Sequence, residues 1–141
     1  MPASIVLDTS VLIAGLRSAE GASHELLRRL GGTDFLMSIS VPLILEYEAV
    51  AKRQARELGL TFADVDDILD YICSVADHRA IFYLWRPFLP DPTDDLLLEL
   101  AVEAGADFIV THNLRHFRGV NDFGVTPISP GDFLRRLRVV P

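Results

Sequence analysis

The chain has 141 residues, half of them hydrophobic, which is enough to bury the core of one folded domain. Its net charge of -7 is the opposite of the basic balance that is typical of nucleic-acid binders. No apolar run approaches the roughly 18 residues that span a bilayer, and the N-terminus lacks the pattern of a secretory signal. We therefore expect a single cytoplasmic domain over residues 1–141, with no membrane partner.

Net charge alone does not exclude a negatively charged substrate. Acids that surround a bound cation count as negative in the sequence, yet the cation neutralises them in the working molecule. The single cysteine, Cys73, lies among apolar residues at helical spacing. We expect it to be a buried thiol, because one cysteine cannot build a disulfide framework or a zinc site.

Short apolar runs alternate with amphipathic segments along the whole chain. The first half of the chain predicts a strand over residues 5–7, a short helix from residue 11, a helix over 21–30, a strand over 35–39, and a helix that is capped by Ser40 and runs to about residue 58. A helix over 62–76, a strand over 80–84 and a proline-rich connection over 86–92 follow. The last elements are a helix over 93–104, strands over 107–111 and 125–128, and a helix over 130–138.

Strands that alternate with helices form βαβ units with right-handed crossovers. The predicted fold is therefore α/β, a three-layer α/β/α domain with a mostly parallel sheet of about five strands. Because proline cannot donate a hydrogen bond to a neighbouring strand, Pro127 indicates that the last strand lies at the edge of this sheet. The sequence contains no internal repeat and no sign of a second domain.

Polar side chains recur at one kind of place in this predicted fold, the edge where strands end and helices begin. They are Asp8 after the first strand, Glu46 and Glu48 in the helix after the second, Asp94 and Asp95 at the start of the helix after the third, and Asn113 after the fourth. Ligands of open α/β sheets bind at this carboxyl edge. Four further acids, in the helix over 62–76, lie on different sides of that helix and indicate a solvated face.

Each residue of this group also has a purely structural explanation. Asp8 and Asn113 can cap the helix that follows, and Asp91 before a proline is an ordinary helix start. Acids in a first turn also favour the positive end of the helix dipole. Periodicity does not decide which of Glu46 and Glu48 points inward. It is nevertheless less common for four polar positions to gather at one edge of a sheet by coincidence than for one shared reason.

The chemistry that favours such a cluster is the binding of a hard cation. Mg²⁺ and Mn²⁺ take oxygen ligands, keep several waters and need only one or two carboxylates beside a substrate phosphate. Carboxylates held together without a cation repel one another and raise at least one pKa. In two-metal sites such ions activate water and stabilise the leaving oxygen of an in-line displacement.

Other chemistries fit the sequence poorly. Zinc or thiol chemistry lacks cysteines, and His112 and His116 have no acid between them as in a metalloprotease motif. A Gly-rich phosphate loop is missing. A phospho-acceptor domain needs a lysine beside the phosphate, but Lys52 lies in the wrong segment. A phosphatase of the haloacid-dehalogenase type needs a second acid where Ser10 stands.

Four segments carry a resemblance to a known family: residues 6–12, residues 42–47, residues 91–95 together with Leu100-Ala101, and residues 110–113. In this order they resemble PIN-domain proteins, and most of all the prokaryotic PIN proteins that serve as toxin components of toxin–antitoxin pairs. The resemblance covers nearly the whole chain. It implies a Rossmann-like sheet and a metal-dependent ribonuclease.

The resemblance also implies roles for individual residues. Asp8, Glu46 and Asp94 match the three family acids that hold metal, so the match favours Glu46 over Glu48. Asn113 matches the fourth catalytic position, which is Asp in many members and Asn in others. The neutral amide lowers the charge of the site and bears on how well a second cation is held.

Further residues are expected to support the site or to contact substrate. The supporting candidates are Thr9, Ser10, Asp95 and Thr111, with Asp91 as an outer partner. The candidates for RNA phosphate contacts are Arg115, Arg118 and the group Arg135, Arg136 and Arg138, which could equally meet an acidic partner segment.

We therefore expect hydrolysis of RNA phosphodiester bonds with Mg²⁺ or Mn²⁺ and water as the nucleophile. The implied partners are the RNA substrate, an antitoxin protein and a second copy of the chain in a homodimer. The main alternative is a non-catalytic PIN-like module that binds RNA or protein. A metal-dependent phosphatase is a third and weaker alternative.

Overall fold

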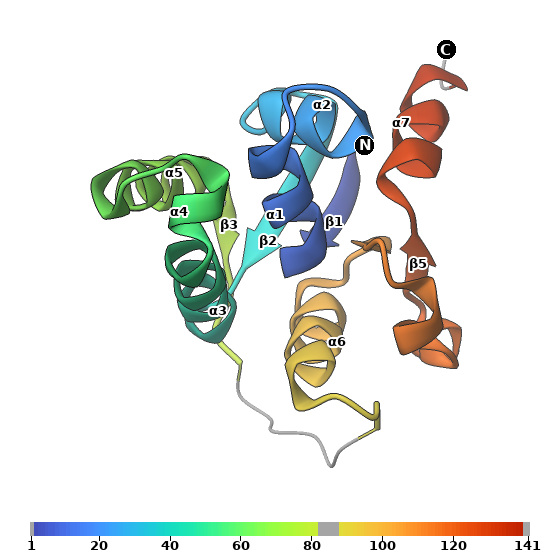
Figure 1. Cartoon of the computed structure of the whole chain (residues 1–141). Helices are drawn as coiled ribbons and strands as arrows, with labels where there is room; N and C mark the ends of the chain where they lie inside the picture. Colours follow the sequence, from blue (N-terminus) through green and yellow to red (C-terminus); the bar gives the residue numbers. More distant parts are fainter. Residues whose placement is uncertain (1, 82–87, 140–141) are drawn as a thin grey trace.

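Within residues 2–81 and 88–139, which the computed structural model describes, a five-stranded parallel sheet has the order β3-β2-β1-β4-β5 (Figure 1). The strands are β1 (Ala3–Leu7), β2 (Phe35–Ile39), β3 (Asp77–His78), β4 (Phe108–Val110) and β5 (Thr126–Ile128). The helices of these ranges are α1 (Thr9–Arg17), α2 (Ala22–Arg28), α3 (Val41–Arg53), α4 (Ala55–Leu58), α5 (Phe62–Val75), α6 (Pro92–Ala104), α7 (Pro130–Val139) and the 3₁₀ helices η1 (Leu114–Phe117) and η2 (Val120–Phe123). The predicted α/β class and the parallel sheet are confirmed.

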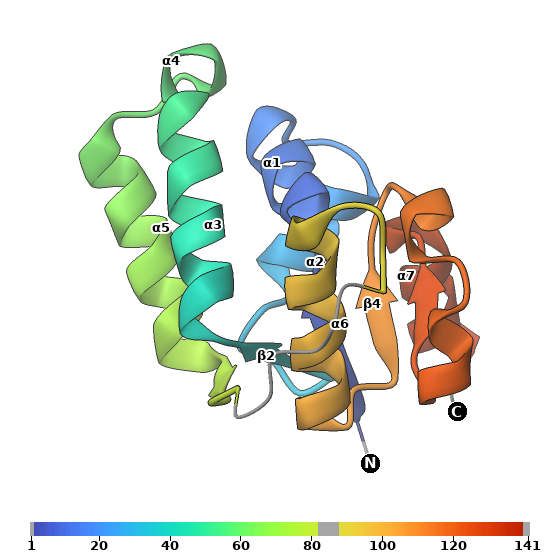
Figure 2. The same cartoon turned by 90° about the horizontal axis from the view of Figure 1, so that it is seen from below.

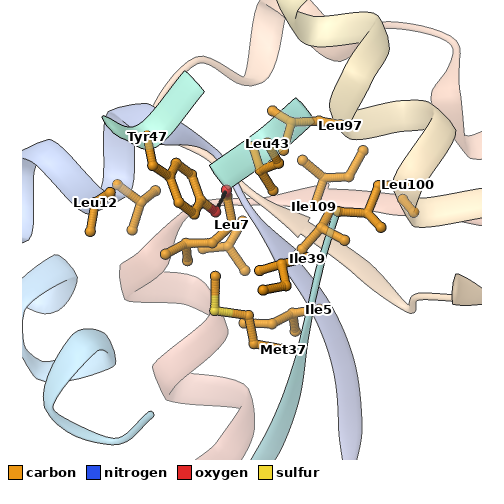
Figure 3. Close-up of a cluster of buried hydrophobic side chains, with 14 of the residues drawn as sticks. Ile5, Leu7, Leu12, Met37, Ile39, Leu43, Tyr47, Leu97, Leu100 and Ile109 are labelled. Atoms are coloured by element: carbon orange, nitrogen blue, oxygen red, sulfur yellow. Dashed lines mark hydrogen bonds between the residues drawn. The ribbon is translucent and has the colours of Figure 1, made fainter. Parts of the chain in front are cut away.

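The central strand β1 is buried on both of its faces. Ile5, Val6 and Leu7 are consecutive, so their side chains point alternately to the two sides of the sheet, and all three are completely buried. Helices therefore cover both faces of the sheet, as expected for a parallel sheet. On one face Leu7 packs with side chains from α1 and α3, including Leu12 and Tyr47 (Figure 3).

The order of the strands creates a crevice beside the carboxyl end of β1. The chain leaves β1 for β2 on one side, and it later returns through α6 to β4 on the other side. Such a reversal of direction is where open α/β sheets bind ligands. Leu7 lies opposite Val110, and the next amide, that of Asp8, donates to the Val110 carbonyl at 2.9 Å. The pairing therefore fixes where both strands end.

Two helices begin at this edge with local signals that the sequence carries. Ser40 accepts a hydrogen bond from the Leu43 amide at the start of α3, and a proline occupies the first turn. Asp91 does the same for α6 by accepting from the Thr93 amide at 2.9 Å. These caps fix where both helices begin, with Asp94 in the first turn of α6 and Glu46 in the second turn of α3.

The third strand differs from the expectation. Instead of residues 80–84, the chain pairs with β2 through Asp77 and His78, and Ala80 and Ile81 are not in a strand. The rest of the expected strand and residues 86–87 of the expected connection lie outside the described residues. Asp77 and His78 are both exposed, so this short edge strand has no hydrophobic pattern and is held by main-chain hydrogen bonds.

Two smaller expectations also differ. The helix expected to run to about residue 58 is interrupted at Gln54, which separates α3 from α4. Cys73 is only partly buried, because the apolar stripe of α5 turns Val65, Leu69 and Ile72 inward instead. The predicted edge position of Pro127 is confirmed by β5, and no described helix is long and apolar enough to cross a membrane.

Tyr47 connects α3 to the end of β1. Its hydroxyl donates to the Leu7 carbonyl in a fully buried environment (Figure 3). Burial, and secondarily the charge of Asp8, raises the pKa of Tyr47, so the phenol stays protonated as a donor.

Tyr47→Phe should lower the free energy of unfolding by about 1–3 kcal/mol, because it leaves the buried Leu7 carbonyl without this donor. Urea unfolding measures the change. The matched control is Tyr71→Phe, which removes a hydroxyl bonded to the Leu30 carbonyl from a half-exposed ring and should cost less. Equal losses in the two variants would contradict this role of Tyr47.

Candidate active site

A cavity of about 380 Å³ opens at the carboxyl edge of the sheet. Its lining residues come mainly from α1, α3 and α6. Helix α3 packs against both of the other helices, and Figure 2 shows how the three are arranged. The lining of the cavity includes four acids and an amide next to them, Asp8, Glu46, Asp91, Asp94 and Asn113. Side chains far apart in the sequence therefore share one hollow at the crevice beside β1.

Asp8 is held by two hydroxyl groups. Its Oδ2 accepts from Ser10 Oγ at 2.9 Å and from Thr111 Oγ1 at 2.7 Å, and the side chain is nearly buried. It does not cap α1, although it occupies the N-cap position. Within the described residues Asp8 Oδ1 accepts no hydrogen bond, so one oxygen is anchored and the other is available to a ligand.

Thr111 links the ends of β1 and β4. Its fully buried hydroxyl donates to Asp8 and accepts from the Asn113 amide at 2.9 Å. Ser10 makes a similar link by accepting from the His112 amide at 3.3 Å. These bonds fix the turn after β4, from which the exposed Asn113 side chain reaches the cavity.

Asp94 has an electrostatic environment that disfavours its charge. Burial first, and then the negative charges of Asp8 and Asp91, raise the pKa of Asp94 from 3.8 to about 6. His116 opposes the shift, since its Nδ1 lies 3.2 Å from Asp94 Oδ2. The contact does not have hydrogen-bond geometry, and Asp94 Oδ2 is a buried oxygen without a hydrogen-bond partner among the described residues.

The structure distinguishes the two glutamates of α3. Glu46 lines the cavity. Glu48 is not among the lining residues and pairs with Lys52, one turn along the same helix, at 3.1 Å. Lys52 in turn reaches Asp66 on α5 at 2.8 Å. Glu48 therefore belongs to a surface ion-pair network.

The remaining candidates are distributed around this centre. Thr9 lines the cavity. Asp95 points elsewhere and accepts from the Phe88 and Leu89 amides at 3.3 and 3.0 Å, which holds the segment before α6. Arg115 and Arg118 are exposed and are not part of the cavity lining.

Four polar lining residues were not assigned to the site by sequence reasoning: Arg17, Gln54, Thr93 and His116. The position of His116 soon after Asn113 is the only signal that could have identified it. Nothing in the sequence distinguishes Arg17 from the other arginines. The three arginines of α7 also lie away from the cavity lining.

The donor set fits a hard divalent cation. Asp8 Oδ1 and Asp94 Oδ2 accept no hydrogen bond from the described residues, and both are carboxylate oxygens, which Mg²⁺ and Mn²⁺ prefer. Among residues 2–81 and 88–139, no three His, Cys, Asp or Glu side chains form a group that could hold a metal ion. This arrangement suits an ion that keeps several waters and uses one or two carboxylates, rather than a closed cage of protein ligands.

Thr111→Val should lower the free energy of unfolding by about 1–3 kcal/mol, because it removes the partner of a buried carboxylate and of the Asn113 amide at nearly constant volume. Chemical denaturation measures this loss. Thr126→Val, an exposed position in β5, is the matched control and should change stability by less than about 0.5 kcal/mol. Equal losses of unfolding free energy in the Thr111→Val and Thr126→Val proteins would contradict the role of Thr111 in anchoring Asp8.

Asp94→Asn should stabilise the metal-free protein relative to the wild type above pH 6. Folding raises the pKa of the Asp94 carboxyl, so its protonated form favours the folded state. This contribution to the free energy of unfolding is complete below about pH 4 and is lost as the pH rises through about 6. The stability difference should therefore grow between pH 4 and pH 6 and then stay constant. Urea unfolding in a chelator at several pH values tests this, with the exposed Asp67→Asn as control. A difference independent of pH would contradict it.

Comparisons with known proteins agree with this architecture. The complex VapBC2 from Rickettsia felis, bound to a DNA fragment from its promoter, contains a chain that is 13% identical, with a TM-score of 0.61 over 89% of this chain and 98% of that one. A DNA-bound VapBC from Salmonella typhimurium gives 16% identity and a TM-score of 0.61 over 91% and 98%. VapBC-1 from nontypeable Haemophilus influenzae gives 13% identity and a TM-score of 0.60 over 91% and 98%. These likenesses show a shared fold.

Among curated proteins, none matches the sequence significantly. A family model described as the PIN domain matches residues 4–115. This span contains β2 to β4, all of β1 except Ala3, and every residue that lines the cavity except His116. The chain therefore belongs to the PIN-domain family.

Proposed function

We propose that this protein is an endoribonuclease that hydrolyses RNA phosphodiester bonds with Mg²⁺ or Mn²⁺, and that it is the toxin component of a toxin–antitoxin pair. The observation that carries the proposal is the pair of carboxylates in the cavity, Asp8 and Asp94. Each has an oxygen that accepts no hydrogen bond from the described residues, and burial, followed by the Asp8 charge, raises the pKa of Asp94. A divalent cation would remove this repulsion.

Asp8 and Asp94 would hold the ion, and Glu46 is another acid that lines the same cavity. A bound divalent cation supplies charge stabilisation to a phosphoryl oxygen and makes water more acidic. The set of oxygen donors favours Mg²⁺ or Mn²⁺ over softer metals. Membership of the PIN-domain family supports the same assignment.

The other residues of the cavity would position the reactants. Ser10 and Thr111 hold the Asp8 carboxylate in one orientation, which preserves the geometry of the site while substrate binds. The Asn113 side chain can donate to a phosphate oxygen or orient the attacking water. Arg115 and Arg118, exposed beside Asn113, would contact RNA phosphates outside the cavity.

We also propose an antitoxin protein and a second copy of this chain as partners. The three similar structures are VapBC complexes, two of them bound to DNA, and this chain covers 98% of the matched chain in each. A protein that hydrolyses RNA in a cell needs a means of control, and a protein partner would supply it.

Wild-type protein should cleave single-stranded RNA with Mn²⁺ and lose this activity in EDTA. Asp8→Asn and Asp94→Asn should each lower kcat/KM by at least about 100-fold, because each removes a charged ligand of the proposed ion. Gel analysis of labelled RNA measures cleavage. Asp67→Asn removes an exposed acid of α5 and should leave the rate unchanged.

Cleavage that persists in EDTA and in both site variants would contradict the metal-dependent mechanism. Stabilisation of the wild type by Mn²⁺ without any cleavage would instead favour the non-catalytic binding module.

A further inference from the structure

The cavity extends away from the acids as a groove between α1 and α3. One wall is formed by Ile13, Ala14 and Arg17, which recur at helical spacing on one face of α1. The other wall is formed by Leu43, Glu46, Val50 and Gln54 along α3 and at its end. Apolar side chains therefore line the middle of the groove, with acids at one end.

Arg17 supplies positive charge at the other end of this groove. Among the described residues it is the only arginine or lysine that lines the cavity. It follows Ser10 by about two turns, or roughly 10 Å, along α1. Its guanidinium is therefore displaced along the groove from the oxygens of Asp8.

The partner of Arg17 orients its charge without neutralising it. Arg17 Nη2 donates to Gln54 Oε1 at 2.8 Å, and the structure contains no ion pair of Arg17 with a described acid. Most guanidinium donors of Arg17 therefore face solvent in an otherwise acidic cavity. A planar guanidinium with free donors is suited to bidentate binding of a phosphate.

We propose that Arg17, held by Gln54, binds a backbone phosphate that flanks the scissile one, so that the RNA strand lies along the groove between α1 and α3. This inference rests on the proposed ribonuclease function. A polyanion must overcome the negative charge of the cavity, and Arg17 offers an attractive contact at the end away from Asp8. The apolar middle of the groove would contact ribose and base surfaces.

Arg17→Met tests the proposal, with Arg53→Met as the matched control. Arg53 is exposed and adjacent to Gln54 in sequence, but it does not line the cavity. Both substitutions remove one positive charge and keep much of the apolar stem. Melting temperatures check that both variants fold as the wild type does.

Binding is measured by fluorescence anisotropy of a labelled single-stranded RNA oligomer with Mn²⁺, in protein that carries Asp8→Asn to prevent cleavage. Adding Arg17→Met should weaken binding about tenfold, as expected for one charged hydrogen-bonded contact. It should also reduce the slope of log affinity against log salt by about 0.7, because one phosphate contact is lost. Arg53→Met should change neither quantity by as much.

Cleavage kinetics test the position of the contact. In the otherwise wild-type protein, Arg17→Met should raise KM and leave kcat nearly unchanged, and the effect should shrink on RNA shortened on the side that Arg17 contacts. A loss that falls on kcat at every substrate length would overturn the flanking position. Equal RNA binding by the Arg17→Met and Arg53→Met proteins would overturn the contact itself.

The two proposals fail in different ways. Absence of cleavage by the wild type would contradict the ribonuclease function, while weaker binding of RNA by the Arg17→Met protein would still support the groove as an RNA site. Cleavage by the wild type with no effect of Arg17→Met on binding would contradict only the inference about Arg17.

Discussion

The candidate site depends on two hydroxyl groups that hold the same carboxylate oxygen. Ser10 and Thr111 both donate to Asp8 Oδ2, and they come from the segments that follow two neighbouring parallel strands. The pairing of β1 with β4 brings these segments together, so the sheet itself determines the geometry of the anchor. Because one oxygen of Asp8 is saturated, the other is left for a ligand. The buried core beneath the cavity, in which Tyr47 bonds the Leu7 carbonyl, keeps the end of β1 in place.

Next to this anchored carboxylate, the fold places a second buried carboxylate, which is electrostatically unfavourable. Asp94 is buried beside Asp8, one of its oxygens has no hydrogen-bond donor among the described residues, and burial together with the negative charges of Asp8 and Asp91 raises its pKa. Hydrophobic packing of α6 against the sheet supplies the free energy that holds the carboxylate there. A departure of this kind from full hydrogen bonding is concentrated at functional sites, where a ligand completes the missing contacts. His116 approaches Asp94 but does not complete them.

The parallel sheet and the edge at which the acids lie could be predicted from sequence, because both follow from local patterns of apolar and polar residues. Apolar runs of strand length gave the parallel sheet, and their ends gave the edge at which Asp8, Asp94 and Asn113 lie. The edge strand β3 was missed because a two-residue polar strand has no hydrophobic period. Local patterns also cannot report a tertiary partner. The pairing of Glu48 with Lys52 at the surface and the position of Arg17 in the groove became visible only in three dimensions.

The central claim is that Asp8 and Asp94 share one divalent cation. A crystal structure of the wild-type protein grown or soaked with Mn²⁺, with diffraction recorded near the manganese absorption edge, tests it most directly. The account predicts an anomalous peak within bonding distance of Asp8 Oδ1 and Asp94 Oδ2, with water completing the coordination. An anomalous map without a peak in this cavity, at a Mn²⁺ concentration that supports activity, would contradict it.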